Sequence, residues 1–94
     1  MVLATRTKGK RATFTLNAPD AKKVLLGGDF NNWDYKRTPL TRNGKDKTWE
    51  KELTLAPGRY EYKFMVDGNW INDPSNNNRT RNSFGTENSV IEIK

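Results

Sequence analysis

The chain contains 94 residues, with 17 lysines and arginines against 11 aspartates and glutamates, which gives a formal net charge of +6. This length provides for one domain with one hydrophobic core, so it excludes a multi-domain enzyme. Cysteine and histidine are both absent. Their absence excludes disulfides, thiolate metal sites and the usual general base, and we expect no metal or other cofactor. A small domain without disulfides also fits a reducing compartment, so we expect the chain in the cytoplasm.

Residues 1–10 are expected to form a flexible lead-in to a single module that covers residues 11–94. The apolar stretch at the amino terminus is too short for a signal peptide or a membrane span, so no membrane partner is expected. The basic residues are spread along the chain, and only residues 8–11 approach a cluster. The charge balance therefore permits binding to nucleic acid or an anionic surface without indicating either.

The first half of the chain predicts two short strands. Residues 12–16 alternate between apolar and polar side chains, as a half-buried strand does. Residues 24–26 form a short apolar run, and Gly27-Gly28 after it indicates a bulge or a close approach of the backbone to another group. Residues 29–47 are polar and predict a loop, with Asn43-Gly44 as a turn signal.

The second half predicts three more strands and a hairpin. In residues 49–55 the alternation places Trp49, Leu53 and Leu55 on one face, and a last strand is expected over residues 90–93. Residues 59–66 alternate most regularly, and their predicted inward side chains are Tyr60, Tyr62, Phe64 and Val66. Short strands at this spacing, with no helical periodicity, predict an all-β fold: a single antiparallel β-sandwich.

Asp67-Gly68 is a strong signal for a two-residue hairpin loop. Such a loop pairs Met65 with Trp70 and Phe64 with Ile71. Trp70 then shares the outward face with Lys63, while Ile71 joins the core. A three-residue loop would reverse this and bury Trp70, so the prediction depends on the register of the hairpin.

The three tryptophans are expected in different environments. Trp49 shares its face with two leucines and is predicted to be core. Trp70 is predicted to be exposed by the hairpin register, whereas Trp33 is compatible with either an exposed platform or packing against the sheet edge. Exposed indoles suit a sugar polymer, because they cover the apolar C–H face of a pyranose while amide or ammonium groups reach its hydroxyls.

The segment from 73 to 88 is long for an unstructured connection and is therefore expected to be functional or disordered. Phe84 within it is compatible with two roles, a ligand contact or a plug at the end of the sandwich. No nucleophile motif, phosphate loop or metal-ligand cluster is present, and the carboxylates of residues 67 and 73 have turn-forming explanations. We therefore predict that the chain is not an enzyme and has no catalytic residues.

Five motifs in order resemble a known family of carbohydrate-binding modules. They are residues 26–33 (Leu-Gly-Gly-Asp-Phe-Asn-Asn-Trp), 39–40, 62–70 (Tyr-Lys-Phe-Met-Val-Asp-Gly-Asn-Trp), 73–74 and 85–89 (Gly-Thr-Glu-Asn-Ser). This series is similar to the glycogen-binding modules of family 48, which include the module of the AMP-activated protein kinase β subunit and the amino-terminal domains of isoamylases and branching enzymes. The resemblance covers residues 11–94 and implies an immunoglobulin-like β-sandwich that binds an α-1,4-linked glucan such as glycogen, starch or a maltooligosaccharide.

In the kinase-subunit version of the family, two tryptophans stack on glucose rings and four further side chains complete the site. Motif by motif, the resemblance assigns these roles to Trp33, Lys63, Trp70, Phe84, Thr86 and Asn88. Phe84 departs from the leucine that is typical of that version, and residues 76–81 are also unlike it.

Two alternatives remain open at this point. One is a structural or interaction domain of a glucan-processing enzyme or of a kinase-type complex. The other is a basic β domain that binds single-stranded nucleic acid by stacking bases on aromatic side chains, although nucleic acid is the less expected partner.

Overall fold

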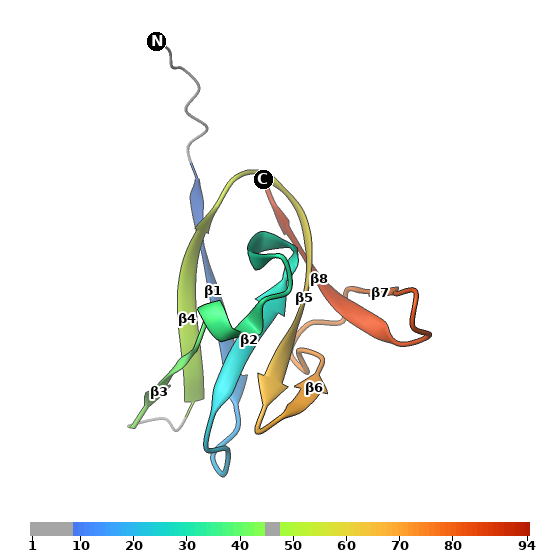
Figure 1. Cartoon of the computed structure of the whole chain (residues 1–94). Coiled ribbons are helices and arrows are strands. Elements are labelled where there is room, and N and C mark those ends of the chain that lie inside the picture. The colour runs from blue at the N-terminus through green and yellow to red at the C-terminus, as the bar shows by residue number, and fades with distance from the viewer. Residues whose placement is uncertain (1–8, 45–47) are drawn as a thin grey trace.

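A computed structural model describes residues 9–44 and 48–94, and it shows two antiparallel β-sheets packed face to face (Figure 1). The predicted β-sandwich is confirmed. The first strand begins at Lys10. Most of the predicted lead-in, residues 1–8, lies outside the described residues.

The first sheet has the strand order β1-β4-β3, with β1 at Lys10–Asn17, β4 at Thr48–Leu55 and β3 at Thr41–Asn43. Alternate residues of β1 are buried, as its sequence predicts. Trp49 is buried and donates its indole N–H to the carbonyl of Ala18 at 3.0 Å, so its prediction as a core residue is confirmed. The strand β3 corrects the prediction of a continuous loop over residues 29–47, because this short segment pairs with β4.

The second sheet has the order β2-β5-β8-β7, and β6 pairs with β5 off this path. Its strands are β2 at Val24–Gly28, β5 at Gly58–Val66, β6 at Asn69–Ile71, β7 at Arg79–Arg81 and β8 at Glu87–Ile93. The segment from 73 to 88 is therefore not unstructured, since it contains β7 and the start of β8. Two short 3₁₀ turns, η1 (Asp29–Asn31) and η2 (Tyr35–Arg37), follow β2.

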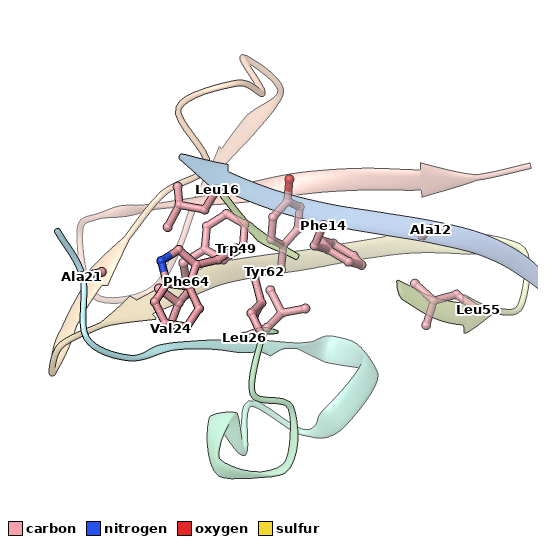
Figure 2. Close-up of a cluster of buried hydrophobic side chains, with 11 residues drawn as sticks. Ala12, Phe14, Leu16, Ala21, Val24, Leu26, Trp49, Leu55, Tyr62 and Phe64 are labelled. Atoms are coloured by element: carbon pink, nitrogen blue, oxygen red, sulfur yellow. The ribbon is translucent and has the colours of Figure 1, made fainter. Parts of the chain in front are cut away.

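The core lies between the two sheets and is centred on aromatic rings (Figure 2). Phe14 of β1 packs edge-on against Tyr62 of β5, with ring centroids 5.0 Å apart, and Tyr62 in turn packs against Phe64 at 6.0 Å. Tyr62 and Phe64 are both almost fully buried, as the alternation of β5 predicts. The opposite face of β5 is thereby turned away from the core, and this is the face that carries Lys63.

The hairpin between β5 and β6 has the predicted register: Met65 pairs with Trp70 and Phe64 with Ile71. Its loop is Asp67-Gly68, and both residues have the positive φ of a type I′ turn, 47° and 89°. The expectation that Ile71 joins the core was wrong, because its side chain is 40% exposed. Within the described residues the three-residue strand β6 pairs with β5 alone and lies outside the order β2-β5-β8-β7, at the margin of the sheet, where Ile71 stays open to solvent.

In the part of the chain that the structure describes, no helix is long and apolar enough to cross a membrane.

Candidate ligand-binding pocket

An open pocket of about 600 Å³ lies on the outer face of the second sheet. All six side chains that the family resemblance singles out line it, although they come from four separate segments of the chain. The lining residues are Trp33, Glu61, Lys63, Trp70, Arg81, Asn82, Ser83, Phe84, Thr86 and Asn88. The fold therefore brings the predicted site residues together in one place.

Trp70 reaches the pocket because the two-residue hairpin turns it to the outer face of β6. Its side chain is 43% exposed, so the prediction of an exposed indole is confirmed. The rings of Tyr35 and Trp33 meet that of Trp70 in edge-to-face contacts, with centroid distances of 5.4 and 5.9 Å. These contacts limit the rotation of the Trp70 ring while leaving much of it open to solvent.

Gly27 lies directly beneath the two tryptophans. A Cβ atom at this position would lie 2.9 Å from Cη2 of Trp70, 3.1 Å from its Cζ3 and 3.5 Å from Cε3 of Trp33. The predicted close approach at Gly27 is therefore confirmed, and its partner is the aromatic pair. Glycine permits the rings to rest on the backbone of β2.

Trp33 is half-buried, and its position depends on an unusual local backbone. Asn32 and Trp33 both have a left-handed conformation, with φ of 57° and 62°, which is uncommon for a residue as bulky as tryptophan. The Trp33 backbone N–H donates to the carbonyl of Gly28 at 2.8 Å, and its indole N–H donates to the carboxylate of Asp29 at 3.0 Å. The ring packs against Trp70 and also lines the pocket, so Trp33 is neither fully exposed nor fully packed away against the sheet.

The polar wall of the pocket is a continuous hydrogen-bond network. Lys63 Nζ donates to Thr86 Oγ1 at 3.4 Å, and the amide of Asn82 donates to both Thr86 Oγ1 and Asn88 Oδ1. Asn88 is only 8% exposed. Its amide Nδ2 donates to Glu61 Oε1 at 2.9 Å, which extends the network to Glu61. Asn88 therefore forms part of the floor, with both ends of its side chain already bonded within the protein.

Phe84 stands at the rim of the pocket and is 89% exposed. The alternative in which it plugs the end of the sandwich is therefore wrong. An aromatic side chain left this open has almost no packing partners of its own, which is typical of a surface that meets a ligand.

Three charged side chains line the pocket: Glu61, Lys63 and Arg81. Glu61 is the only carboxylate among them, and it forms an ion pair of 3.0 Å with Arg59 in addition to its bond with Asn88. Within residues 9–44 and 48–94 no group of three acidic side chains lies close enough together to hold a metal ion.

A buried polar cluster behind the pocket fixes the segment that leads to β7. The phenol of Tyr62 donates to Asp73 at 2.7 Å and accepts from Asn76 at 3.0 Å. The backbone N–H of Asp73 donates to the hydroxyl of Ser89. Burial raises the pKa of the Tyr62 phenol well above its ordinary value, and the Asp73 carboxylate raises it further. The phenol is therefore held neutral, as a hydrogen-bond donor.

Sequence reasoning assigned no role to several residues that build the site. Glu61 could have been identified, since it has the same parity as Lys63 on β5. Asp29, Asn82 and Tyr35 carry no such signal, because they lie outside the strands, in segments whose conformation depends on the folded chain.

The fold and the pocket define a small β-sandwich module with an aromatic-lined binding surface on one sheet. Residues 11–94 match the family described as "Glycogen recognition site of AMP-activated protein kinase", and the chain belongs to this family.

Among its relatives are subunits of this kinase. The chain is 42% identical to the pig kinase subunit beta-1 over 73 residues, which cover 78% of this chain and 56% of that protein. It is 42% identical to human subunit beta-1 over 73 residues, covering 78% of this chain and 25% of that protein. With human subunit beta-2 it shares 38% identity over 88 residues, which cover 94% of this chain and 31% of that protein. The chain thus spans between a quarter and just over half of the length of these relatives.

Proposed function

We propose that this module binds an α-1,4-linked glucan, such as glycogen, starch or a maltooligosaccharide, by stacking Trp33 and Trp70 on glucose rings. Lys63, Phe84, Thr86 and Asn88 complete the proposed site. The observation that carries the proposal is the convergence of these six side chains, from four segments of the chain, on one open pocket. Membership of a glycogen-recognition family supports the same ligand class.

The energetics of stacking suit weak binding to a polymer. Each ring face that an indole covers removes ~100 Å² of apolar area from water, which contributes roughly 2–3 kcal/mol. Each hydrogen bond from the polar wall adds only about 1 kcal/mol net. After the cost of association we expect a Kd between about 1 μM and 1 mM for a single site, which avidity on a branched polymer would strengthen.

The inclination of the two indoles supports a curved chain over a flat one. The ring planes of Trp33 and Trp70 are 70° apart. Two glucose units stacked on these rings must therefore turn sharply relative to each other. Successive glucoses turn in this way along an α-1,4-linked helix, whereas those of a β-1,4-linked ribbon present their faces in parallel. The geometry accordingly favours maltooligosaccharides over cellooligosaccharides.

The proposed role is binding without catalysis. Glycoside hydrolysis generally requires two carboxyl groups that flank the scissile bond. Of the described carboxylates only Glu61 lines the pocket, and its oxygens are bonded to Arg59 and Asn88. A second acid on the opposite side is not among the lining residues.

The relatives are named as kinase subunits, and this chain spans only part of their length. We therefore propose that the module serves to attach a larger assembly, of kinase type or around a glucan-processing enzyme, to its polysaccharide in the cytoplasm. Binding of single-stranded nucleic acid is less favoured, because the family to which the chain belongs is described by glycogen recognition.

The proposal is tested by isothermal titration with maltoheptaose on the wild type and on Trp33→Ala and Trp70→Ala. We expect each substitution to remove most of the binding. Ile71→Ala is the matched control, because this exposed apolar side chain is next to Trp70 but on the opposite face of β6. Its affinity should be that of the wild type. Cellohexaose and a single-stranded oligonucleotide complete the set, each at low and high salt.

Maltoheptaose binding should change little with salt, whereas phosphate contacts weaken steeply as salt rises. Binding to the oligonucleotide alone would favour the nucleic-acid alternative. If none of these ligands binds, the interaction-domain alternative would be favoured.

A further inference from the structure

The loop that carries Phe84 and Thr86 is organised around one side chain, that of Asn82. We propose that Asn82 is the positioning residue of the glucan site: it holds Phe84 out toward the ligand and fixes the hydroxyl of Thr86 as a hydrogen-bond donor. The proposal rests on the proposed function, because the ligand it serves is the glucan.

The carbonyl oxygen of the Asn82 side chain closes the loop. It accepts the backbone N–H of Phe84 at 2.9 Å and that of Thr86 at 3.1 Å. The backbone of Asn82 adds two further bonds, donating to the carbonyl of Thr86 at 2.9 Å and accepting the N–H of Gly85 at 3.3 Å. Gly85 supplies the positive φ of 85° that this tight path requires.

This closure determines where Phe84 lies. A side chain that is 89% exposed has no packing that could hold it in place. Its direction must therefore come from the backbone, and the Phe84 backbone is fixed by the side chain of Asn82. A rim residue fixed in advance loses less conformational entropy when the ligand arrives.

The same bonds fix the orientation of the Asn82 amide. Because its oxygen accepts two backbone N–H groups, its nitrogen must be the atom that faces Thr86 Oγ1 at 2.7 Å and Asn88 Oδ1 at 3.0 Å. The side chain thus makes two acceptor and two donor bonds, which is the full capacity of an amide. No residue without both a donor and an acceptor can replace it.

The direction of the Thr86 hydroxyl follows from this arrangement. Its oxygen accepts from Asn82 Nδ2 and from Lys63 Nζ, and neither of those groups can accept a proton in return. Both lone pairs are then used, so the hydroxyl proton must point elsewhere. It has no acceptor among the side chains and carbonyls of the described chain, and Thr86 lines the pocket. Thr86 therefore offers the ligand a donor, for which a sugar hydroxyl oxygen is the acceptor.

Two substitutions separate the two parts of the proposal. Asn82→Ala removes all four side-chain hydrogen bonds of Asn82. The loop should therefore loosen, and the Thr86 hydroxyl should lose its orientation. Asn82→Asp keeps acceptors for the Phe84 and Thr86 amides, but it presents an oxygen where the donor nitrogen was. The Thr86 hydroxyl would then turn to donate to this carboxylate and would be lost to the ligand. Asn77→Ala is the matched control, since this exposed asparagine lies outside the pocket.

Backbone amide hydrogen exchange and maltoheptaose titration are measured on each variant. Asn82→Ala should speed exchange at Phe84 and Thr86 and weaken binding about tenfold. Asn82→Asp should leave these amides protected and still weaken binding about fivefold. In the double variant Asn82→Ala/Phe84→Ala, binding should be weakened by less than the product of the two single effects, because Asn82 acts partly through Phe84. Asn77→Ala should behave as the wild type.

Unchanged exchange at Phe84 and Thr86 in Asn82→Ala would overturn the positioning role. Wild-type affinity in Asn82→Asp would overturn the role of the Thr86 hydroxyl as a donor to the ligand. Strictly multiplicative effects in the double variant would overturn the role of Phe84. The exchange measurement needs no ligand, so it reports on Asn82 even where the wild type fails to bind maltoheptaose. That failure would count against the proposed function alone.

Discussion

The indole N–H of Trp33 donates a 3.0 Å hydrogen bond to the carboxylate of Asp29. The other oxygen of this carboxylate accepts the backbone N–H of Glu61, on the central strand β5, at 2.8 Å. One side chain thus ties an aromatic platform in a loop to the rigid sheet that forms the pocket floor. Because Trp33 has a left-handed backbone conformation, the hydrogen bond between its indole and Asp29 also offsets part of the local strain.

Substituting Asp29 should weaken glucan binding without removing the platform itself. In Asp29→Ala the Trp33 ring loses its anchor, and we expect affinity for maltoheptaose to fall about fivefold, the loss of roughly one hydrogen bond. The control is Asp34→Ala on the same loop, because the Asp34 side chain forms an exposed ion pair with Arg37, which contributes little. Titration of both variants checks this prediction. Equal affinities in the two variants would show that Asp29 does not position Trp33.

A methyl group at Gly27 should displace the aromatic pair. In Gly27→Ala the new Cβ would lie 2.9 Å from the Trp70 ring, so the indole must move away from the strand. The ring tip is free to shift toward solvent, so we expect a small loss of stability and a loss of affinity of about tenfold or more. Gly44→Ala, where nothing lies within 4 Å of the added methyl, is the control. Unfolding followed by tryptophan fluorescence measures the loss of stability, and titration with maltoheptaose measures the loss of affinity. Wild-type affinity in Gly27→Ala would contradict the placement of the rings on β2.

The buried phenol of Tyr62 should make stability depend on alkaline pH. Because its pKa is raised in the folded state, the folded protein keeps this proton while the unfolded chain loses it above the ordinary value of about 10. The unfolded state then binds fewer protons, so the contribution of this group to stability is full below pH 10 and falls as the pH rises above it.

Tyr62→Phe tests this dependence. The variant should lose about 1–3 kcal/mol at pH 7, because Asp73 and Asn76 each lose a buried partner. The difference in the free energy of unfolding between the variant and the wild type should shrink between pH 10 and pH 11, since only the wild type loses stability through this phenol. Urea unfolding at both pH values measures it. A difference that stays constant with pH would contradict the raised pKa.

The hairpin that presents Trp70 is anchored through Asp67. The Asp67 carboxylate accepts the backbone N–H groups of Lys22 and Lys23, at 3.0 and 2.8 Å, besides taking the left-handed conformation of the turn. Asp67→Ala should therefore cost about 1–3 kcal/mol of stability, with a smaller effect on glucan affinity, because the register is still set by Gly68 and the alternation of β5. Thermal unfolding and titration check the two parts. A loss of affinity without a loss of stability would show that Asp67 acts on the site by another route.

The sequence predicted the parts of the site that depend on local rules. Asp67-Gly68 specifies a two-residue turn, and the alternation of β5 then fixes the outward direction of Lys63 and Trp70. The same alternation predicted a buried Ile71 wrongly, because strand parity identifies a face of the sheet but not how far the opposite sheet extends over it.

The remaining parts of the site depend on contacts between distant segments. The place of Trp33 is set by a left-handed turn and by Asp29, whose carboxylate accepts the backbone N–H of Glu61, 32 positions away. The role of Asn82 is likewise visible only once β7 and β8 bring it beside Asn88. Periodicity and turn signals contain no information on such pairs, so the family resemblance alone placed Trp33 in the site.

The central claim is that a glucan contacts Trp33 and Trp70, and the three indole N–H signals in an NMR titration with maltoheptaose test it most directly. Trp49 is an internal reference, because its ring is buried and its N–H donates to Ala18. We predict that the signals of Trp33 and Trp70 shift with one common saturation curve while that of Trp49 stays in place. Saturable binding that moves neither of the two pocket signals, or that moves only Trp49, would contradict the proposed site.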